Sequence, residues 1–360
     1  MNNIRQPCVA ITGMNAKPEN PGPGVAVARC LKESAEFCGQ IIGLGYDALD
    51  PGLYMEQFVD EGYLLPYPSA GEDALLRRLE EIHKISPIDI MIPCLDAELP
   101  SFIRLAHKLN SLGIKTVLPD AEQFRLRNKD LLRELAEHAG IECPGIKSIS
   151  NIGFFNDCDK RGWEFPLVVK GIFYDAYVVH HKDEASSAFR KIAEQWGYPV
   201  LVQKFVKGEE YNLTAIGDGN GQLVAPVMMK KMALTDKGKA WAGVSIYDQE
   251  LLNAAIRLVA AIKWRGPLEM EVIKDGTGQY QLLEINPRFP AWIYLSHGVL
   301  RNLPLALLHI AMNESVPTFS DYRTGMLFIR YAEELVVPIS VFEDVVMQGS
   351  RSNSKEVSEL

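Results

Sequence analysis

Short apolar segments alternate with longer amphipathic segments over the first 120 residues of the chain. The apolar segments predict strands at residues 8–12, 41–44, 88–93 and 115–118, and the amphipathic segments predict helices at 25–36, 72–84 and 98–112. Strands separated by helices of about 10–15 residues are typical of βαβ units. The pattern therefore predicts a parallel sheet in the first third of the chain.

The pattern changes near residue 120, where strands come to dominate. A charged helix is predicted at 128–140, because Gly140 suits a helix C-terminus, and a second helix at 183–196, with Asp183 as its N-cap. Further on, the sequence predicts a helix at 249–263, a hairpin at 268–286, a helix at 303–312 and a strand at 326–331. The segment after Gly349 is polar, and we expect it to be frayed.

Composition and charge narrow the class of protein. The chain has 360 residues, of which 47% are apolar, and 46 acidic residues against 37 basic ones give a net charge of −9. Such an acidic chain is a poor candidate for nucleic-acid binding, which needs a basic surface. The six cysteines form no CxxC pair, and no apolar run approaches 18 residues. We therefore expect a cytoplasmic enzyme of two or three subdomains, with no signal peptide, no membrane segment and no nucleic-acid partner.

The predicted hairpin carries the most informative cluster of polar residues. A turn at Asp275-Gly276-Thr277-Gly278 would pair Glu269 with Glu284 and Glu271 with residue 282. Because side chains alternate along a strand, Glu269, Glu271, Glu284 and Asn286 would share one face, and Leu268, Met270, Val272, Leu283 and Ile285 the other. Facing carboxylates repel each other, and a hard divalent cation would relieve this. A solvated polar face is the alternative, and a register slip of one residue would remove the argument.

Three further features add cationic and polar candidates. Arg288 follows Asn286 by two residues, and arginine binds anionic oxygens bidentately. Lys170 ends the apolar stretch 165–170, whereas Lys129 opens the helix after residue 128. The apolar segment 200–206 breaks at Gly208 and offers backbone groups to a purine edge. A lone lysine is more often a solvated surface charge, but Lys170 is less so than most because three apolar residues immediately precede it.

In this order, these elements resemble the ATP-grasp superfamily. The resemblance runs from about residue 125 to 315 and includes the Glu-Ile-Asn-Pro-Arg segment 284–288 and the Gln-Lys-Phe-Val segment 203–206. It implies an α/β fold of the α+β ATP-grasp type. Its expected parts are a Rossmann-like preATP-grasp domain (1–120), a small lobe (121–200), a large lobe (201–348) and a disordered tail (349–360). Within this superfamily, the chain is most similar to the carboxylate–amine ligases that resemble carbamoyl phosphate synthase or D-alanine ligase.

The resemblance also implies roles for individual residues. Lys129 and Lys170 would hold the ATP phosphates, the hinge would read adenine, and Glu210 would bind the ribose; the hinge consists of Gln203, Lys204, Phe205 and Val206. Glu271, Glu284 and Asn286 would be the metal ligands, whereas Glu269 has no ligand role. Arg288 would steady an acyl phosphate, and Lys231, rather than Lys230, would meet the γ-phosphate.

Two departures from the family pattern stand out. Gln203 occupies a hinge position that is often glutamate, and the segment 171–177 lacks the usual glycine-rich lid. Substrate specificity is expected from the first domain and from the segments 233–243 and 289–302. The aromatic or titratable candidates in these segments are Trp241, Phe289, Trp292, Tyr294 and His297, each of which could equally serve packing.

The resemblance implies an ATP-dependent carboxylate–amine ligase that forms an amide or peptide bond through an acyl phosphate. Its cofactors would be ATP and Mg²⁺, with Mn²⁺ as a substitute. Its partners would be small-molecule or peptide substrates, and the enzyme could form a homodimer. One alternative is an NAD-dependent dehydrogenase on the first βαβ units, although GxGxxG is absent. Another is a non-catalytic nucleotide-binding regulator, which would differ from an enzyme by the loss of its metal ligands.

Overall fold

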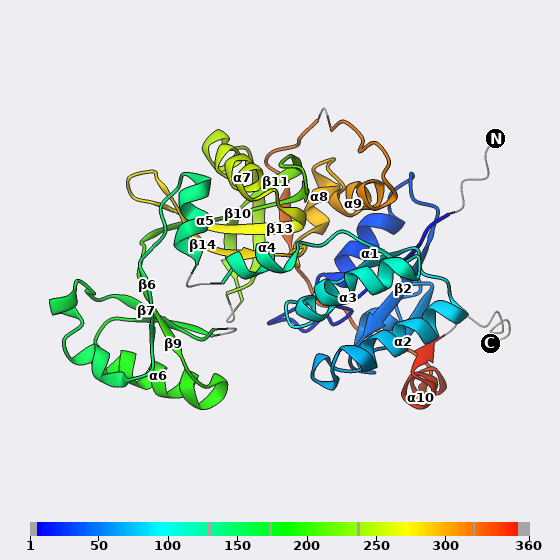
Figure 1. The fold of residues 1–360 in the computed structure, drawn as a ribbon, viewed down its shortest axis with the longest axis horizontal. Helices are drawn as coiled ribbons and strands as arrows, with labels where there is room; N and C mark the ends of the chain where they lie inside the picture. The colour runs from blue at the N-terminus through cyan, green and yellow to red at the C-terminus, as the bar shows by residue number, and fades with distance from the viewer. Residues whose placement is uncertain (1–5, 129–130, 173–174, 236–237, 320, 352–360) are drawn as a thin grey trace.

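The computed structural model describes residues 6–128, 131–172, 175–235, 238–319 and 321–351, and its strands form three sheets (Figure 1). The first is a parallel sheet, as the pattern predicts, with strand order β16-β3-β2-β1-β4-β5 and one antiparallel edge strand, β16. Its elements are β1 (Cys8–Ile11), α1 (Gly24–Lys32), β2 (Gln40–Gly45), β3 (Glu61–Leu64), α2 (Glu72–Ile85), β4 (Ile90–Ile92), α3 (Leu99–Ser111) and β5 (Lys115–Thr116).

Two apolar layers cover the faces of this sheet. Leu79 of α2 and Phe102 of α3 belong to one buried cluster, and Leu31 of α1 belongs to the other. Short 3-10 turns lie at Pro51–Leu53 and Pro68–Ala70. Because both faces are covered, the strands read as nearly continuous apolar runs. The short strand β3, with Glu61 at its start, has no such run and is absent from the predicted elements.

The end of the chain returns to this first sheet. Helix α10 (Ile339–Gln348) leads into β16 (Ser350–Arg351), which pairs with β3. The expectation of a frayed segment directly after Gly349 is therefore wrong for residues 350 and 351. Arg351 is buried and donates to the carbonyls of Leu53 and Val59, which holds the strand in place.

A four-stranded antiparallel sheet forms a separate small lobe, which Figure 1 shows at the lower left with α6 on one face. Its strands, in the order β6-β9-β7-β8, are β6 (Ile146–Ile149), β7 (Leu167–Lys170), β8 (Ala176–Val179) and β9 (Val200–Lys204). Two 3-10 turns (Ile152–Asn156 and Asp159–Arg161) and helix α6 (Lys182–Trp196) complete it. The N-cap of α6 is His181 and not Asp183, because the His181 ring accepts from the backbone N–H of Glu184.

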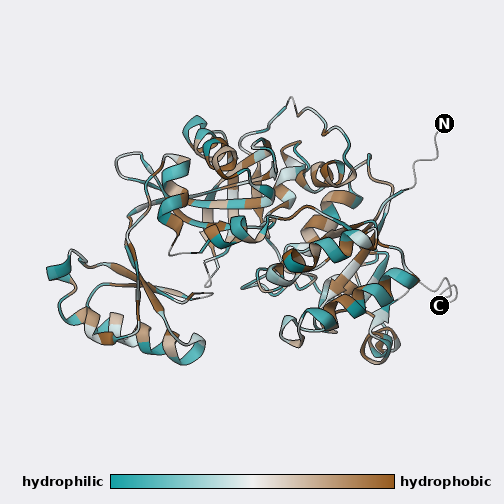
Figure 2. Ribbon diagram, viewed as in Figure 1, coloured by the Kyte–Doolittle hydropathy of each residue, from teal (hydrophilic) through white to brown (hydrophobic). Residues whose placement is uncertain are grey.

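The third sheet is a mostly antiparallel platform in the middle of the molecule, with strand order β14-β13-β10-β11-β12-β15. Figure 2 shows hydrophobic and hydrophilic positions mixed along its strands and on the surrounding helices. Its strands are β10 (Gly208–Asp218), β11 (Leu223–Leu234), β12 (Ala240–Ile246), β13 (Arg265–Asp275), β14 (Tyr280–Asn286) and β15 (Leu327–Ile329). The accompanying helices are α4 (Ala121–Leu126), α5 (Leu132–Ala139), α7 (Gln249–Ile262), α8 (Tyr294–Gly298) and α9 (Leu303–Met312).

Helices α5 and α7 pack against one face of this platform. Leu135 and Leu258 share a buried cluster with Met270 and Ile285 of the hairpin. Helix α5 ends at Gly140 in the left-handed conformation, as its sequence predicts, but it begins at Leu132. No helix in the described ranges is both long and apolar enough to cross a membrane, and all six cysteines are free thiols.

Candidate active site at the end of the central hairpin

The hairpin brings two carboxylates face to face through a bulge that the sequence does not reveal. Lys274 pairs with Tyr280, and Val272 pairs with Leu282, so the register near the turn is shifted by one residue from the expected one. A bulge between Glu271 and Val272 then adds a second residue of shift. Because two shifts restore the alternation, the acidic positions keep their common face.

The actual pairs therefore differ from the predicted ones. Glu271 lies opposite Glu284, and Glu269 lies opposite Asn286, whereas the sequence suggested Glu269 opposite Glu284. Leu282 takes the buried position expected for Leu283, which lies at the bulge and is half-buried. The cluster predicted on one face thus forms, with different cross-strand partners.

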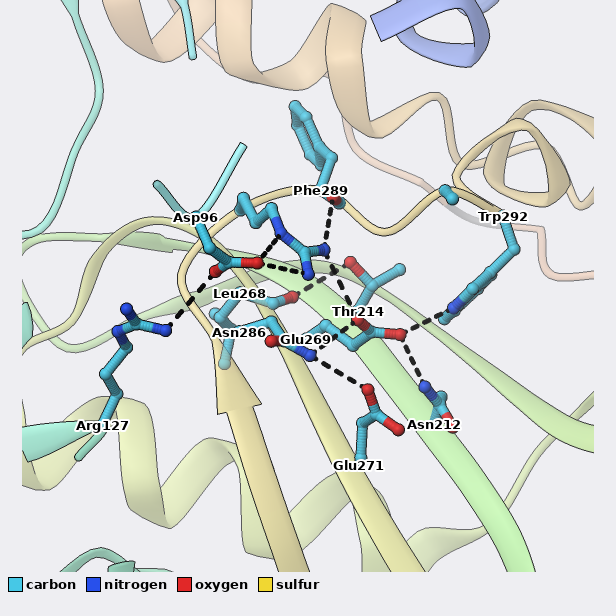
Figure 3. Close-up of polar contacts among 12 residues, drawn as sticks. Asp96, Arg127, Asn212, Thr214, Leu268, Glu269, Glu271, Asn286, Phe289 and Trp292 are labelled. Carbon is cyan, nitrogen blue, oxygen red and sulfur yellow. Dashed lines mark hydrogen bonds and ion pairs between the residues drawn. The ribbon is translucent and has the colours of Figure 1, made fainter. Parts of the chain in front are cut away.

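Glu269 is the most buried acid of this cluster, with 4% of its surface exposed. Oε1 accepts from Asn212 Nδ2 at 2.5 Å and from Trp292 Nε1 at 2.7 Å, and Oε2 accepts from Asn286 Nδ2 at 3.1 Å (Figure 3). Burial raises the pKa of the Glu269 carboxyl, and the neighbouring Glu271 raises it further. The residue that the resemblance leaves without a role is thus a centre of the hydrogen-bond network.

Glu271 forms the charged part of the cluster. Its Oε2 lies 2.8 Å from Lys231 Nζ, which also lies 2.9 Å from Glu210 Oε2. Its Oε1 accepts from Asn286 Nδ2 at 3.0 Å. Burial acts to raise the pKa of Glu271, but the nearby charges of Lys231, Lys239 and Arg288 together hold that pKa below the ordinary range. Lys230 instead pairs with Glu209 at 2.6 Å, so Lys231 is the lysine that joins the cluster.

Arg288 connects the hairpin end to the first domain. Its Nε and Nη2 both lie 2.7 Å from Asp96 Oδ2, and its Nη1 lies 3.9 Å from Glu269 Oε2. Asp96 also meets Arg127 at 3.4 Å, as Figure 3 shows. Burial opposes ionisation of Asp96, but Arg288 and then Arg127 keep its pKa below the usual value. Arg288 is therefore held in one orientation by a residue 192 positions earlier in the chain.

The nucleotide candidates lie mainly on the small lobe. Lys170, at the end of β7, donates to Gln203 Oε1 on β9 at 2.6 Å. The Nε2 of Gln203 is buried and has no acceptor among the described residues. Lys204 and Phe205 follow on the exposed hinge, and Glu210 begins the platform. Lys129 and part of the predicted lid, residues 173 and 174, lie outside the described residues.

A cavity of about 200 Å³ opens between the hairpin end and the loops of the first domain. Lys231, Glu271 and Arg288 line it from the platform. The other lining residues are Asn15, Asn20, Pro21, Pro23, Cys94, Leu95, Asp96, Ala97, Asn212, Gly238, Lys239, Ala240, Glu269, Pro290, Ala291, Trp292 and Arg330. Of the five aromatic or titratable specificity candidates, Trp292 is the one that lines this cavity.

The donor set at the hairpin end fits a hard divalent cation. Glu271 and Glu284 face each other directly, and Asn286, bonded to Glu271 through Nδ2, keeps Oδ1 as an acceptor. No three His, Cys, Asp or Glu side chains in the described residues could hold a metal by themselves. Mg²⁺ is usually held by one or two carboxylates together with substrate phosphates, so two glutamates and an amide oxygen suffice.

Several residues of the cavity carry no local sequence signal. Asp96, Asn212, Lys239 and Arg330 come from four different parts of the chain and meet only in the folded molecule. Asp96 follows β4 at the carboxyl edge of a parallel sheet, where ligands commonly bind, and that position could have indicated it. The other three lack even such a positional clue.

The family model described as "ATP-grasp in the biosynthetic pathway with Ter operon" matches residues 197–333. The chain is 25% identical over 202 residues to the carbamoyl phosphate synthase large chain of Clostridium beijerinckii, covering 52% of this chain and 18% of that one. It is 26% identical over 165 residues to phosphoribosylamine–glycine ligase of Helicobacter pylori, covering 43% of this chain and 37% of the relative. The chain therefore spans less than half the length of either relative.

The fold is also similar to solved structures. The L-amino acid ligase from Bacillus licheniformis superposes with a TM-score of 0.64 at 18% identity, covering 88% of this chain and 77% of that one. At this identity the likeness concerns the fold alone. The sequence of residues 197–333 thus resembles the ATP-grasp family, and the fold of most of the chain resembles that of a solved ligase.

Proposed function

We propose that the protein is an ATP-dependent carboxylate–amine ligase that forms an amide or peptide bond. The observation that carries the proposal is the hairpin end, where Glu271, Glu284 and Asn286 form an oxygen-rich set beside Lys231 and Arg288. The relatives named carbamoyl phosphate synthase and phosphoribosylamine–glycine ligase support the same class of reaction.

ATP would bind between the small lobe and the platform in this proposal. Lys170 would contact the phosphates, and the hinge Gln203–Val206 would contact the adenine; Lys129 remains a proposal from the sequence. The buried Nε2 of Gln203 supports this placement, because an unsatisfied donor is costly unless a ligand supplies the acceptor. Glu210, half-exposed where the platform begins, is the proposed ribose contact.

Magnesium would be held by Glu271, Glu284 and Asn286, with Mn²⁺ as a substitute, and would neutralise phosphate charge. In the first step, a carboxylate oxygen of the substrate attacks the γ-phosphorus, and ADP leaves. In the second step, an amine attacks the acyl carbon, loses a proton, and expels phosphate that carries the former carboxylate oxygen. Lys231 and Arg288 would stabilise the negative oxygens in these steps from fixed positions.

Three glycines, at positions 13, 22 and 24, follow the first strand, where a dinucleotide could bind, but they have another explanation. A Cβ at Gly22 would lie 2.3 Å from the carbonyl oxygen of Gly13, and one at Gly24 would lie 2.0 Å from that of Thr12. These glycines are needed because the loop packs against its own backbone. They therefore give no support to the dehydrogenase alternative.

Comparing the binding of ATP and NAD distinguishes the ligase proposal from the dehydrogenase alternative. ATP with Mg²⁺ should stabilise the chain by about 2.7 kcal/mol at a hundredfold excess over Kd, because only the folded state binds it. NAD should have no comparable effect in the same thermal-unfolding series. A larger shift with NAD than with ATP would reject the ligase proposal.

The reaction itself is tested by ADP release across pools of carboxylates and amines, followed by mass spectrometry of the product. The carboxylate that gives turnover is then labelled with ¹⁸O. An acyl-phosphate route transfers one labelled oxygen to the released phosphate, because the carbon–oxygen bond is the one that breaks. Unlabelled phosphate alongside a new amide would contradict this route.

A further inference from the structure

Two of the four cations that line the cavity form no direct ion pair with a carboxylate among the described residues. Lys231 pairs with Glu271 and Glu210, and Arg288 pairs with Asp96. Lys239 and Arg330 line the same cavity but form no ion pair with any carboxylate in the described part of the chain. At longer range the Lys239 charge still lowers the pKa values of Glu271 and Asp96, whereas burial lowers the pKa of Arg330. A ligand anion beside Arg330 would therefore relieve the cost of burying its charge.

Arg330 is held in place by neutral groups. Its backbone N–H donates to the carbonyl of Trp241 at 2.8 Å, and its Nη2 donates to the carbonyl of Ala291 at 2.9 Å. The Nε is buried without an acceptor among the described residues. Two backbone anchors thus orient a guanidinium that still has unused donors, and a guanidinium matches carboxylate or phosphate oxygens in pairs.

Lys239 lines the same cavity from the end of a loop, and Arg330 lines it from just after the neighbouring strand β15. Lys239 directly precedes β12, and β12 pairs with β15 so that Ala242 lies opposite Ile329. The turn before β12 is closed by a hydrogen bond from the Thr235 N–H to the Lys239 carbonyl at 2.8 Å. This hydrogen bond fixes the backbone next to the cavity that Lys239 lines.

We propose that Arg330 and Lys239 form a subsite for a second anionic group of the substrate, separate from the centre formed by Glu271 and Arg288. The substrate would then carry a carboxylate or a phosphate in addition to the reacting carboxylate. A cavity of about 200 Å³ lies below the usual ~300–1,000 Å³ of drug-sized sites, so the group that enters is small. This inference rests on the proposed ligase function.

The test compares ligands that differ in one charge. With saturating MgADP, calorimetry on the full chain measures binding of succinate, of 3-phosphonopropionate, and of succinamate, which has one carboxylate replaced by an amide. At least one dianion should bind about tenfold or more tightly than succinamate, since a charged hydrogen-bond pair is worth at least that factor. The stronger of the two dianions identifies the second group as carboxylate or phosphate.

The variants Arg330→Met and Lys239→Met should remove this preference while leaving MgADP affinity unchanged. Arg301→Met is the matched control: Arg301 also donates to one carbonyl, that of Pro226, and also has a buried Nε without an acceptor, but it lies outside the cavity lining. It should keep the preference. If Arg330→Met does not fold, the same measurement is made on Lys239→Met and Arg330→Lys. Lys239→Met should then lose the preference for the dianion, and Arg330→Lys should weaken it.

Three results would overturn the subsite: equal affinity for succinamate and both dianions, no binding of any of them, or a preference that survives in Lys239→Met and Arg330→Met together. If MgADP itself fails to bind the wild-type chain, the proposed ligase function fails and not merely the subsite. For the substrate found by the ADP screen, Arg330→Met should raise KM at least about tenfold and change kcat much less.

Discussion

Two regions of the molecule bury a glutamate, one just before helix α3 and one within strand β13, and their surroundings differ. In the first domain, Glu98 is 1% exposed and accepts from the Thr12 and Tyr46 hydroxyls and from the backbone N–H groups of Cys94 and Leu95. In the platform, Glu269 is bonded to amide and indole groups and lies close to Glu271 and Arg288. Burial raises the pKa of both carboxyls.

Glu98 and Glu269 differ in the charge of their neighbours and in their access to the cavity. Every hydrogen-bond donor to Glu98 is neutral, and Glu98 is not among the residues that line the cavity. Its bonds tie β1 and the end of β2 to the loop that carries Asp96. Glu269 lies among ions at the cavity wall. A buried carboxylate thus indicates chemistry when charged partners and an open space accompany it, and otherwise indicates structure.

The largest effect is expected from Glu284→Gln. This change removes one anionic metal ligand and preserves shape, so kcat for ADP formation should fall by at least ~10²-fold with folding intact. Glu98→Gln is the control and should keep most of its activity. Equal activity of the two variants would contradict the functional difference between the two regions.

Arg288→Ala should lower the single-turnover rate on the order of 10²-fold, because a fixed donor to developing negative charge is lost. Its nucleotide Kd should change little, whereas Lys170→Ala should weaken nucleotide binding itself. Asp96→Asn should lower the rate less than Arg288→Ala does, since Asp96 acts on the reaction by orienting the arginine. Loss of ATP affinity in Arg288→Ala with a normal chemical step would remove the role given to Arg288.

The variants Glu98→Gln and Glu269→Gln should also differ in their free energy of unfolding. In Glu98→Gln, the amide oxygen can take the Oε1 position, and the Tyr46 hydroxyl can rotate to accept from the new NH₂. In Glu269→Gln, both carboxylate oxygens already face N–H donors, so one donor loses its acceptor. We expect a cost of about 1–3 kcal/mol for Glu269→Gln, measured by urea unfolding, and a smaller one for Glu98→Gln. The reverse order would contradict this reading.

The smallest effect concerns pH. Because the folded-state pKa of Glu98 is raised, the folded state binds its proton more tightly than the unfolded state. This contribution to stability is complete below the ordinary glutamate pKa and is lost as pH rises towards the raised value. Over that window, urea midpoints of Glu98→Gln should fall less with rising pH than those of the wild type. Parallel pH profiles would show that Glu98 titrates normally.

The sequence predicts the hairpin face because alternation survives a shift of two residues, so Glu271, Glu284 and Asn286 are found without knowledge of the bulge. It cannot predict that Asp96 pairs with Arg288, or that Lys239 and Arg330 line one cavity, since the folding of distant segments brings these residues together. It also misses β16, whose two residues are held by the buried Arg351. The division into a first domain and two lobes remains a proposal; the expected boundary at 200/201 falls within β9.

The most direct test of the central claim is a titration of Mn²⁺ followed by electron paramagnetic resonance, with a non-hydrolysable ATP analogue present. It needs no knowledge of the substrate. The wild type and Glu98→Gln should bind Mn²⁺ with the same affinity, and Glu284→Gln should bind it at least about tenfold more weakly, because a direct ligand is lost. Equal Mn²⁺ affinity in all three proteins would contradict the assignment of the metal to the hairpin end.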